Sequence, residues 1–351
     1  MVYARRYVLL QKNQMQKNLA KPAMLMVLLV VAVIGGWEIY LRQRGISIAY
    51  DDGGPMWSDK RAMVYEDKAD VFIGSSRIKY DLDVDTWKQL TGRHAVQLSL
   101  EGHSPLPFLL DLADDPKFRG RLVVDVTELL YFSDLPPYLA DSKTDVEYYK
   151  KQTPAQRASF FINHGVESQF VFLDQRFLSL NAMLGNLPFT DRPGIIGEPK
   201  FPIEFWRQDF SRQTKMSPRF VSDTTLQNQV TGVWSFFLDL GAKMPPPKVD
   251  PAPGIIRQSK EAVEKIRARG GDVVFIRTPS SGRFWAVEQV AFPRAKFFDE
   301  LVREAGAKGY FFTDYPGLAK YVPTEWSHLS PENAVGFTRE LVKVLPASFT
   351  N

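Results

Sequence analysis

Residues 69–77 read Ala-Asp-Val-Phe-Ile-Gly-Ser-Ser-Arg, and this stretch decides the fold class. Its first five residues form a short, mostly apolar and partly β-branched run, which is typical of a buried strand. The Gly74-Ser75-Ser76 that follows would place a serine hydroxyl at the carboxyl edge of a sheet, where α/β folds usually hold their sites. The stretch therefore predicts a parallel strand that ends in a candidate nucleophile.

Strand and helix patterns alternate outward from this stretch, which indicates a parallel sheet in an α/β fold. Further strands are predicted over 95–100, 122–127, 272–277 and 310–313, and helices over 83–90, 105–114, 255–269, 293–305 and 331–344. Residues 133–250 interrupt the alternation, since they are aromatic-rich, punctuated by proline and without clean periodicity. We interpret them as a mostly helical insertion that could form a lid or a partner surface. The aromatic residues of 159–180 and 205–237 are interpreted as core in preference to a carbohydrate platform.

A second informative string lies near the other end of the domain, Glu325-Trp-Ser-His328-Leu-Ser-Pro331. It offers a carboxylate three residues before a histidine, just ahead of a helix that begins with proline. Ser330 is an obvious helix N-cap, which explains part of the string without catalysis. Serine, histidine and carboxylate together are the parts of a nucleophilic hydrolase or acyltransferase.

Composition excludes several other classes. The chain has 351 residues and a net charge of +4, and no Lys/Arg run is dense enough for a nucleic-acid arm. It contains no cysteine and four histidines, so a thiolate nucleophile is excluded and a zinc site is disfavoured. We therefore predict no metal, no cofactor and no nucleic-acid partner.

The N-terminal region predicts a membrane segment. Residues 1–21 hold five basic and no acidic side chains, and the uncharged run 22–37 is followed by Glu38, Ile39, Tyr40 and Leu41. A run of this length approaches the roughly 20 residues that span a bilayer. Because the basic residues before it outnumber Arg42 and Arg44 after it, the N-terminus should stay in the cytoplasm. We predict a cytoplasmic segment 1–21, an inner-membrane signal anchor 22–41, a juxtamembrane connector 42–68 and an exported domain 69–351; a cleaved signal peptide is the alternative.

These two strings and the order of the elements resemble the SGNH hydrolase superfamily. More narrowly, they resemble its membrane-anchored members, such as the alginate-acetylation proteins and the D-alanyl-transfer protein of teichoic acid modification. The resemblance covers about residues 69–130 and 255–345. It implies a three-layer α/β/α, flavodoxin-like parallel sheet.

The resemblance also implies roles for individual residues. Ser76 maps to the family's nucleophile, His328 to its base, and the amides of Ser76 and Gly102 to its oxyanion hole. Glu325 stands where the family usually has Asp. The Gly-x-Asn-Asp block, whose Asn donates to the oxyanion, has no clear counterpart, because the third strand ends in Asp125-Val-Thr-Glu128.

Secondary candidates lie at the same predicted edge of the sheet. Asp314 is the main alternative to Glu325 as the carboxylate that orients the histidine. Ser75 fills the variable slot of the first motif, and Arg77 could contact an anionic sugar or pair with a carboxylate. His103 could line the site from the Gly102 turn. Arg277 opens a loop, 277–282, that should border the cleft and contains spare serines.

The expected function is serine-dependent O-acyl transfer, most simply O-acetylation, to an exopolysaccharide or cell-wall polymer. By resemblance, a multispanning membrane O-acyltransferase would act beside it as a partner. Two alternatives remain open: an esterase that deacetylates the same polymers, and a catalytically silent scaffold subunit of a polymer-modification or secretion complex.

Overall fold

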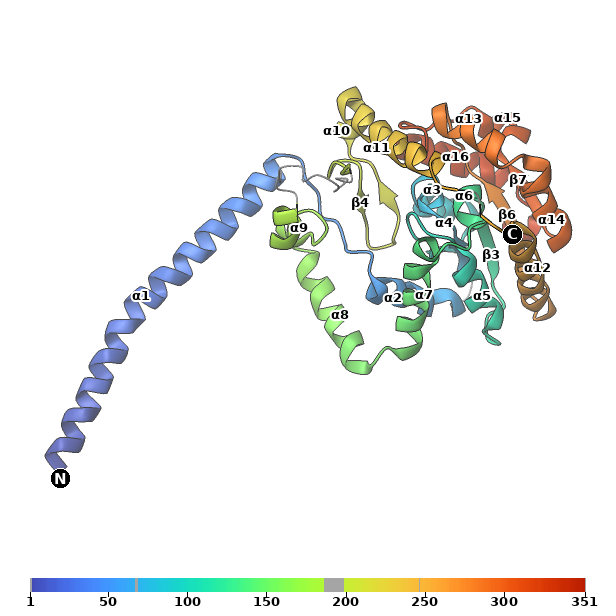
Figure 1. Cartoon of the computed structure of the whole chain (residues 1–351). Helices are drawn as coiled ribbons and strands as arrows, with labels where there is room; N and C mark the ends of the chain where they lie inside the picture. Colours follow the sequence, from blue (N-terminus) through green and yellow to red (C-terminus); the bar gives the residue numbers. More distant parts are fainter. Residues whose placement is uncertain (1, 67–68, 186–198, 246, 351) are drawn as a thin grey trace.

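Strand β1 (Ala69–Ile73) occupies an inner position of a five-stranded sheet and is buried over its whole length. The computed structural model, shown in Figure 1, describes residues 2–66, 69–185, 199–245 and 247–350. All strands of the sheet are parallel in the order β2-β1-β3-β6-β7. The other strands are β2 (His94–Gln97), β3 (Arg121–Asp125), β6 (Asp272–Arg277) and β7 (Lys308–Phe311). This order is the doubly wound, flavodoxin-like order, so the predicted α/β class with a parallel sheet is confirmed.

Register places apolar residues of neighbouring strands side by side. Val71 pairs with Val96 on one side and with Leu122 on the other, and Val124 pairs with Phe275. The strands are buried on both faces because helices cover both, as parallel sheets require.

Two groups of helices cover the sheet. One comprises α4 (Val84–Thr91), α16 (Pro331–Val344) and α17 (Ala347–Thr350), which pack against one another. The other comprises α5 (Leu106–Asp114), α12 (Ala252–Ala268) and α14 (Phe298–Ala305). The ends of helix α4 are set by local sequence. Asp83 caps its first turn, and Gly92 ends it in a left-handed conformation at φ +66°.

Short helices and turns complete the sheet domain. They are α3 (Ser76–Asp81), α6 (Glu128–Tyr131), α13 (Gly282–Ala291), α15 (Pro316–Ala319) and the 3₁₀ turns η3 (Arg294–Lys296) and η4 (Phe312–Asp314). The helix predicted over 293–305 is therefore divided between η3 and α14, and α13 was not predicted.

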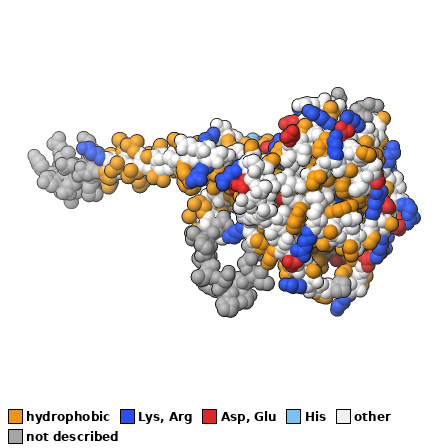
Figure 2. Space-filling view, turned by 90° about the horizontal axis from the view of Figure 1, so that it is seen from above, with side chains coloured by type: hydrophobic (Ala, Val, Ile, Leu, Met, Phe, Trp, Pro, Cys, Tyr) orange, Lys and Arg blue, Asp and Glu red, His pale blue; other side chains and the backbone are white. Residues whose placement is uncertain are grey.

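The N-terminal helix α1 (Val2–Gln43) extends away from the domain (Figure 1). Within its segment Leu19–Gln43, an 18-residue window has a mean hydropathy of 2.2. The segment is long and apolar enough to cross a membrane, as an anchor or as a signal sequence. In Figure 2 hydrophobic side chains predominate along the middle of the described part of this helix, and Lys or Arg side chains lie at its two ends.

The segment expected as a juxtamembrane connector packs into the domain instead. It forms α2 (Gly54–Ala62) and η1 (Met63–Tyr65), with Pro55 in the first turn of α2. Trp57 is fully buried in the main core, and its indole donates to the carbonyl of Leu98 at 3.0 Å. Residues Trp57 and Arg61 lie four apart, so one face of α2 turns both inward.

The segment expected as an insertion is mostly helical, as predicted, and also contains a small antiparallel pair. Its elements are α7 (Pro136–Lys151), α8 (Pro154–Glu167), η2 (Val171–Leu173), α9 (Leu180–Gly185), β4 (Arg207–Gln208), β5 (Thr214–Lys215), α10 (Pro218–Ser222) and α11 (Thr224–Ala242). Helix α7 packs on α2 and α5 and so belongs to the sheet domain. A second hydrophobic cluster joins Phe205, Phe220 and Val230 of the insertion to Tyr80 of α3. The insertion therefore packs directly against the helix that follows β1.

Candidate active site

The end of β1 presents Ser76 at the start of α3. Gly74 approaches its neighbours closely, because a Cβ there would lie 2.7 Å from both the Asp125 Cβ and the Ile78 Cγ2. Ser75 caps α3, accepting from the Arg77 amide, and its hydroxyl bonds that of Thr127 at 2.7 Å. Structural hydrogen bonds thus engage the Ser75 hydroxyl, whereas Ser76 is partly exposed.

His328 and Glu325 meet Ser76 in one chain of hydrogen bonds. The Ser76 Oγ lies 2.8 Å from the His328 Nε2, and the His328 Nδ1 lies 2.7 Å from the Glu325 Oε1. Both His328 and Glu325 are buried. The arrangement has the connectivity of a serine–histidine–carboxylate triad, with a nucleophile, a base and a carboxylate that orients the base.

The second Glu325 oxygen has its own donor. The indole N–H of Trp234, in α11 of the insertion, donates to the Glu325 Oε2. Both carboxylate oxygens therefore have a hydrogen-bond partner, as buried polar groups require. Sequence reasoning missed Trp234, because it lies in the region without periodicity and no local signal links it to residue 325.

The loop that holds Glu325 and His328 is conformationally restricted. Trp326 has φ +81°, a left-handed conformation that costs an aromatic residue energy. Its ring covers Gly282, where a Cβ would lie 2.4 Å from the indole, and its carbonyl accepts from the Ser281 amide at 2.8 Å. Asp81 of α3 accepts from the Leu329 amide at 2.8 Å, so α3 fixes the loop from the other side.

Aromatic rings enclose the imidazole. The ring of Tyr80 lies 4.4 Å from that of His328 between centroids, and those of Phe205 and Trp234 lie 5.5 and 5.8 Å away. Burial raises the pKa of the Tyr80 hydroxyl, which therefore stays neutral beside the histidine. Exclusion of water by these rings strengthens the interactions among the three triad residues.

Two backbone amides are available near the serine. The first amides of a helix have no intrahelical acceptor, and Ser76 is the first residue of α3. Gly102 lies in the turn after β2 at φ +70°, and its amide has no acceptor among the residues that the structure describes. The Leu100 amide donates to the Gly74 carbonyl at 3.2 Å, which brings this turn beside the start of α3.

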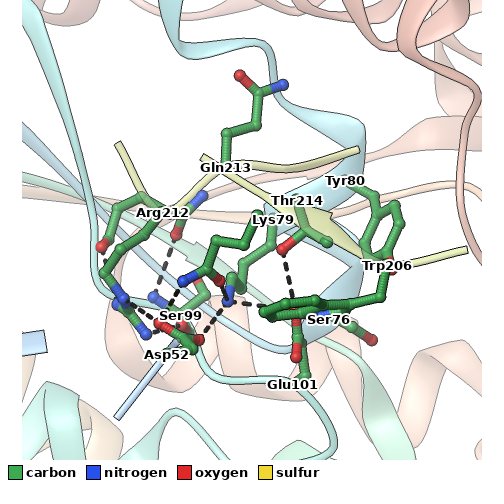
Figure 3. A network of polar contacts seen from close by, with 12 residues as sticks. Asp52, Ser76, Lys79, Tyr80, Ser99, Glu101, Trp206, Arg212, Gln213 and Thr214 are labelled. Atoms are coloured by element: carbon green, nitrogen blue, oxygen red, sulfur yellow. Dashed lines mark hydrogen bonds and ion pairs between the residues drawn. The ribbon is translucent and has the colours of Figure 1, made fainter. Parts of the chain in front are cut away.

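A buried polar network fixes the Gly102 turn (Figure 3). The carboxylate of Glu101 contacts the ammonium of Lys79 at 3.2 Å, the indole of Trp206 at 2.5 Å and the hydroxyl of Thr214 at 2.9 Å. Neighbouring cations hold the pKa of Glu101 below its usual range despite its burial. Because Lys79 lies on α3 with Ser76, the network connects the turn to the helix that carries Ser76.

The same network reaches the segment that leads from α1. Lys79 also pairs with Asp52, and Asp52 accepts from the guanidinium of Arg212 at 2.6 Å. Arg212 donates further to the carbonyls of Gln97 and Ser99, at 2.9 and 3.0 Å, so the loop between β4 and β5 covers the end of edge strand β2.

The remaining arginine candidates have structural partners. Arg77 is buried and donates to Ser327 at 3.2 Å and to Glu288 at 2.5 Å, so it pairs with a carboxylate, one of its two predicted roles. Arg277 is buried between Glu128, at 2.9 Å, and Glu288.

His103 and Asp314 are also engaged elsewhere. The His103 Nδ1 lies 2.7 Å from the Glu101 carbonyl, and its Nε2 lies 3.3 Å from Asp141. Asp314 is exposed and paired with Arg294, so Glu325 is the carboxylate at hydrogen-bond distance from the histidine.

At the end of β3, where the family that the sequence resembles has its Gly-x-Asn-Asp block, this chain has Thr127, whose hydroxyl has a structural role. The Thr127 hydroxyl donates to Asp125 at 3.1 Å and bonds Ser75, so it is occupied within the core. No residue outside the two backbone amides was predicted for the oxyanion.

Comparison with protein-family models and with curated proteins gave no match. The arrangement of Ser76, His328 and Glu325 is therefore the basis for assigning chemistry.

Proposed function

We propose that this chain is a membrane-anchored serine O-acyltransferase that acts outside the cytoplasm on an exopolysaccharide or cell-wall polymer, most simply as an O-acetyltransferase. One observation supports it above all others: hydrogen bonds of 2.8 and 2.7 Å join Ser76, His328 and Glu325. These three residues come from the two strings that alone suggested the chemistry in the sequence.

The first half-reaction acylates Ser76. The neutral His328 Nε2 takes the proton of the Ser76 hydroxyl as its oxygen attacks the carbonyl carbon of an acyl donor. The tetrahedral oxyanion then faces the amides of Ser76 and Gly102; losing one such donor typically costs about 2.7–4 kcal/mol of transition-state stabilisation. Collapse breaks the bond to the leaving group, which receives the proton from His328, and leaves an acyl ester on Ser76.

The second half-reaction transfers the acyl group from Ser76 to the acceptor. His328 takes a proton from a sugar hydroxyl, whose oxygen attacks the acyl carbon of the Ser76 ester. The ester bond to Ser76 breaks, the serine oxygen regains the proton from His328, and the acylated sugar leaves. Glu325 holds the imidazole tautomer and stabilises the imidazolium in both half-reactions.

The charge distribution around α1 supports the proposed orientation. Five basic residues precede the apolar segment, whereas Arg42 and Arg44 follow it, so the domain would lie on the side opposite the cytoplasm. A multispanning membrane O-acyltransferase is the proposed source of the acyl group, on the family resemblance alone.

An esterase is the second candidate, because Ser76 is partly exposed and water could reach its acyl ester. The two activities use the same residues and differ only in the acceptor. Partition of a preformed acyl-enzyme between acetate and acetylated oligosaccharide separates them.

Trapping of the acyl-enzyme tests the proposal. The full chain in detergent is mixed with p-nitrophenyl acetate, and release of nitrophenolate and the intact mass are followed. The expected result is a burst and one added acetyl group, both lost in Ser76→Ala and retained in the matched control Ser281→Ala. If folded wild type and Ser76→Ala are equally inert, the chain is a scaffold instead of an enzyme.

A further inference from the structure

The insertion carries an exposed apolar surface that neither the core nor the triad uses. It comprises Phe161, Ile162 and Val166 of α8, Phe170 after it, and Leu180 and Leu184 of α9, hereafter the α8–α9 apolar face. Ile162 and Leu180 expose 69% and 74% of their surface. Single exposed apolar residues are ordinary, but a group on two neighbouring elements marks a contact surface.

The outward direction of this face is fixed by packing on the other side of α8. The His164 ring stacks on Phe210 at 3.7 Å between centroids and lies 5.1 Å from that of Tyr50. Residues 160 and 164 lie one turn apart and form the inner side of the helix. Ile162 and Val166 then point away from the domain, on a side of α8 that Ala155 and Ala158 complete without a charge.

The α8–α9 apolar face adjoins the end of the apolar helix α1. Glu38 accepts from the amides of Val171 and Phe172, at 3.0 and 3.1 Å. Arg42 donates to the Gln169 carbonyl at 2.8 Å. The segment between α8 and α9 is therefore fastened to the last turns of α1, and Figure 1 shows both helices on the side of the domain from which α1 leaves.

The contact lies at the level expected for a membrane surface. Trp37 and Tyr40 flank Glu38 and stack at 5.4 Å, and aromatic residues of this kind concentrate where a spanning helix leaves the hydrocarbon. Arg44 lies over the Tyr40 ring at 5.2 Å, as a cation at a headgroup would. Apolar side chains fastened beside this belt would meet lipid if α1 crosses a membrane.

We propose that the α8–α9 apolar face lies in the domain-side leaflet of the membrane that α1 crosses, as a second, interfacial contact with lipid. The inference rests on the membrane anchor in the proposed function and is independent of the acyl transfer. Its occupant is the headgroup and upper acyl region of phospholipid, since the face continues from the apolar surface of α1. The domain would then be held against the bilayer at two places.

The absence of cysteine makes a direct test possible. Single-cysteine variants Ile162→Cys and Leu180→Cys of the full chain are labelled with an environment-sensitive fluorophore and reconstituted into phosphatidylcholine–phosphatidylglycerol vesicles. Quenching is measured with lipids that carry a spin label near the top of the acyl chain, and separately with aqueous iodide. Val290→Cys is the matched control, since Val290 is 82% exposed on α13.

Lipid quenching at positions 162 and 180 at least threefold above that at position 290, with iodide quenching reduced, is the expected result. Quenching by iodide equal to that at position 290 overturns the proposal, and so does shielding from both quenchers, which indicates self-association. Val30→Cys, near the middle of the apolar segment of α1, is measured with a lipid spin label near the end of the acyl chain and separates the two hypotheses. Without lipid quenching there the anchor itself is wrong, whereas quenching at 30 but not at 162 refutes only the interfacial contact.

Discussion

Replacing Glu325 by glutamine is predicted to inactivate the site, because it forces His328 into the wrong tautomer. The Trp234 indole determines which tautomer forms, since it fixes the orientation of the glutamine amide. In the native site, Glu325 accepts two hydrogen bonds, from the His328 Nδ1–H and from the Trp234 indole. A glutamine amide offers one acceptor oxygen and one donor nitrogen. Because the indole can only donate, it selects the rotamer with the oxygen toward Trp234 and the NH₂ toward His328. The His328 Nδ1 must then accept, so the proton moves to Nε2, where it blocks removal of the Ser76 proton.

The expected loss follows from the wrong tautomer. The equivalent amide substitution in serine proteases lowers turnover by about 10⁴, which corresponds to about 5.5 kcal/mol. The double variant Glu325→Gln, Trp234→Phe removes the selecting donor, so the amide can rotate and present its oxygen to His328. Acylation should recover at least tenfold over the single Glu325→Gln variant, although Trp234→Phe alone should slow the enzyme about tenfold by leaving one carboxylate oxygen unpaired.

The measurement is the rate constant of the nitrophenolate burst of the full chain with p-nitrophenyl acetate, for wild type, both single variants and the double variant. Near-ultraviolet circular dichroism shows that each is folded. The reasoning is refuted if the two substitutions multiply, so that the double variant is slower than Glu325→Gln.

Three further predictions concern stability. Gly74→Ala should lower the free energy of unfolding by about 1–3 kcal/mol, because its Cβ would overlap two neighbours, whereas Gly254→Ala, with open space around it, should not lower it; urea denaturation compares them. Burial raises the pKa of Asp145 to about 7, above its usual value of 3.8, so the folded chain retains a proton that the unfolded chain loses. This group's contribution to stability is therefore lost as pH rises from about 4 to 7, on the order of 1 kcal/mol per pH unit, and Asp145→Asn should become more stable than wild type over that range in thermal melts. Arg277→Met should cost about 3–5 kcal/mol, since it leaves buried carboxylates unpaired, against less than about 0.5 kcal/mol for the exposed Arg303→Gln, measured by the same denaturation.

Two results, each a comparison with a control variant, would contradict these expectations. Equal midpoints for Gly74→Ala and Gly254→Ala would show that the close approach to Asp125 relaxes freely. A stability difference between Asp145→Asn and wild type that stays constant with pH, as expected of the exposed Asp141→Asn, would exclude a raised pKa at position 145.

The sheet could be predicted because its strands are apolar runs bounded by glycine, proline or charge. The predicted strand 272–277 coincides with β6, and the apolar run 69–73 coincides with β1. Strand β3 begins one residue before and ends two residues before the predicted strand 122–127. Helix α13 escaped prediction because Glu288 is its only buried residue, so no apolar periodicity marks it. Strands β4 and β5 are two residues each, too short for alternation to be visible.

The candidate site likewise contains residues that the local sequence predicts and residues that only the tertiary packing identifies. Ser76, Glu325 and His328 lie in short strings whose chemistry is local, and the structure brings these three together. Trp234 could not be foreseen, since its role depends on how α11 packs across the loop before α16. The connector was misjudged because polar residues, 58–60, separate Trp57 from Arg61, and only the folded chain supplies the buried partners of these two side chains.

The separation of Ser76 from its base has a consequence for biogenesis. They are 252 residues apart, so at about 5–20 residues per second the serine is synthesised some 10–50 s before His328 exists. In the proposed mechanism the Ser76 hydroxyl would have no general base during that interval, so the nascent chain would not acylate itself or its surroundings. In the proposed mechanism, reactivity would appear only when the segment before α16 packs against α3, so the synthesis of that segment is the step on which activity depends.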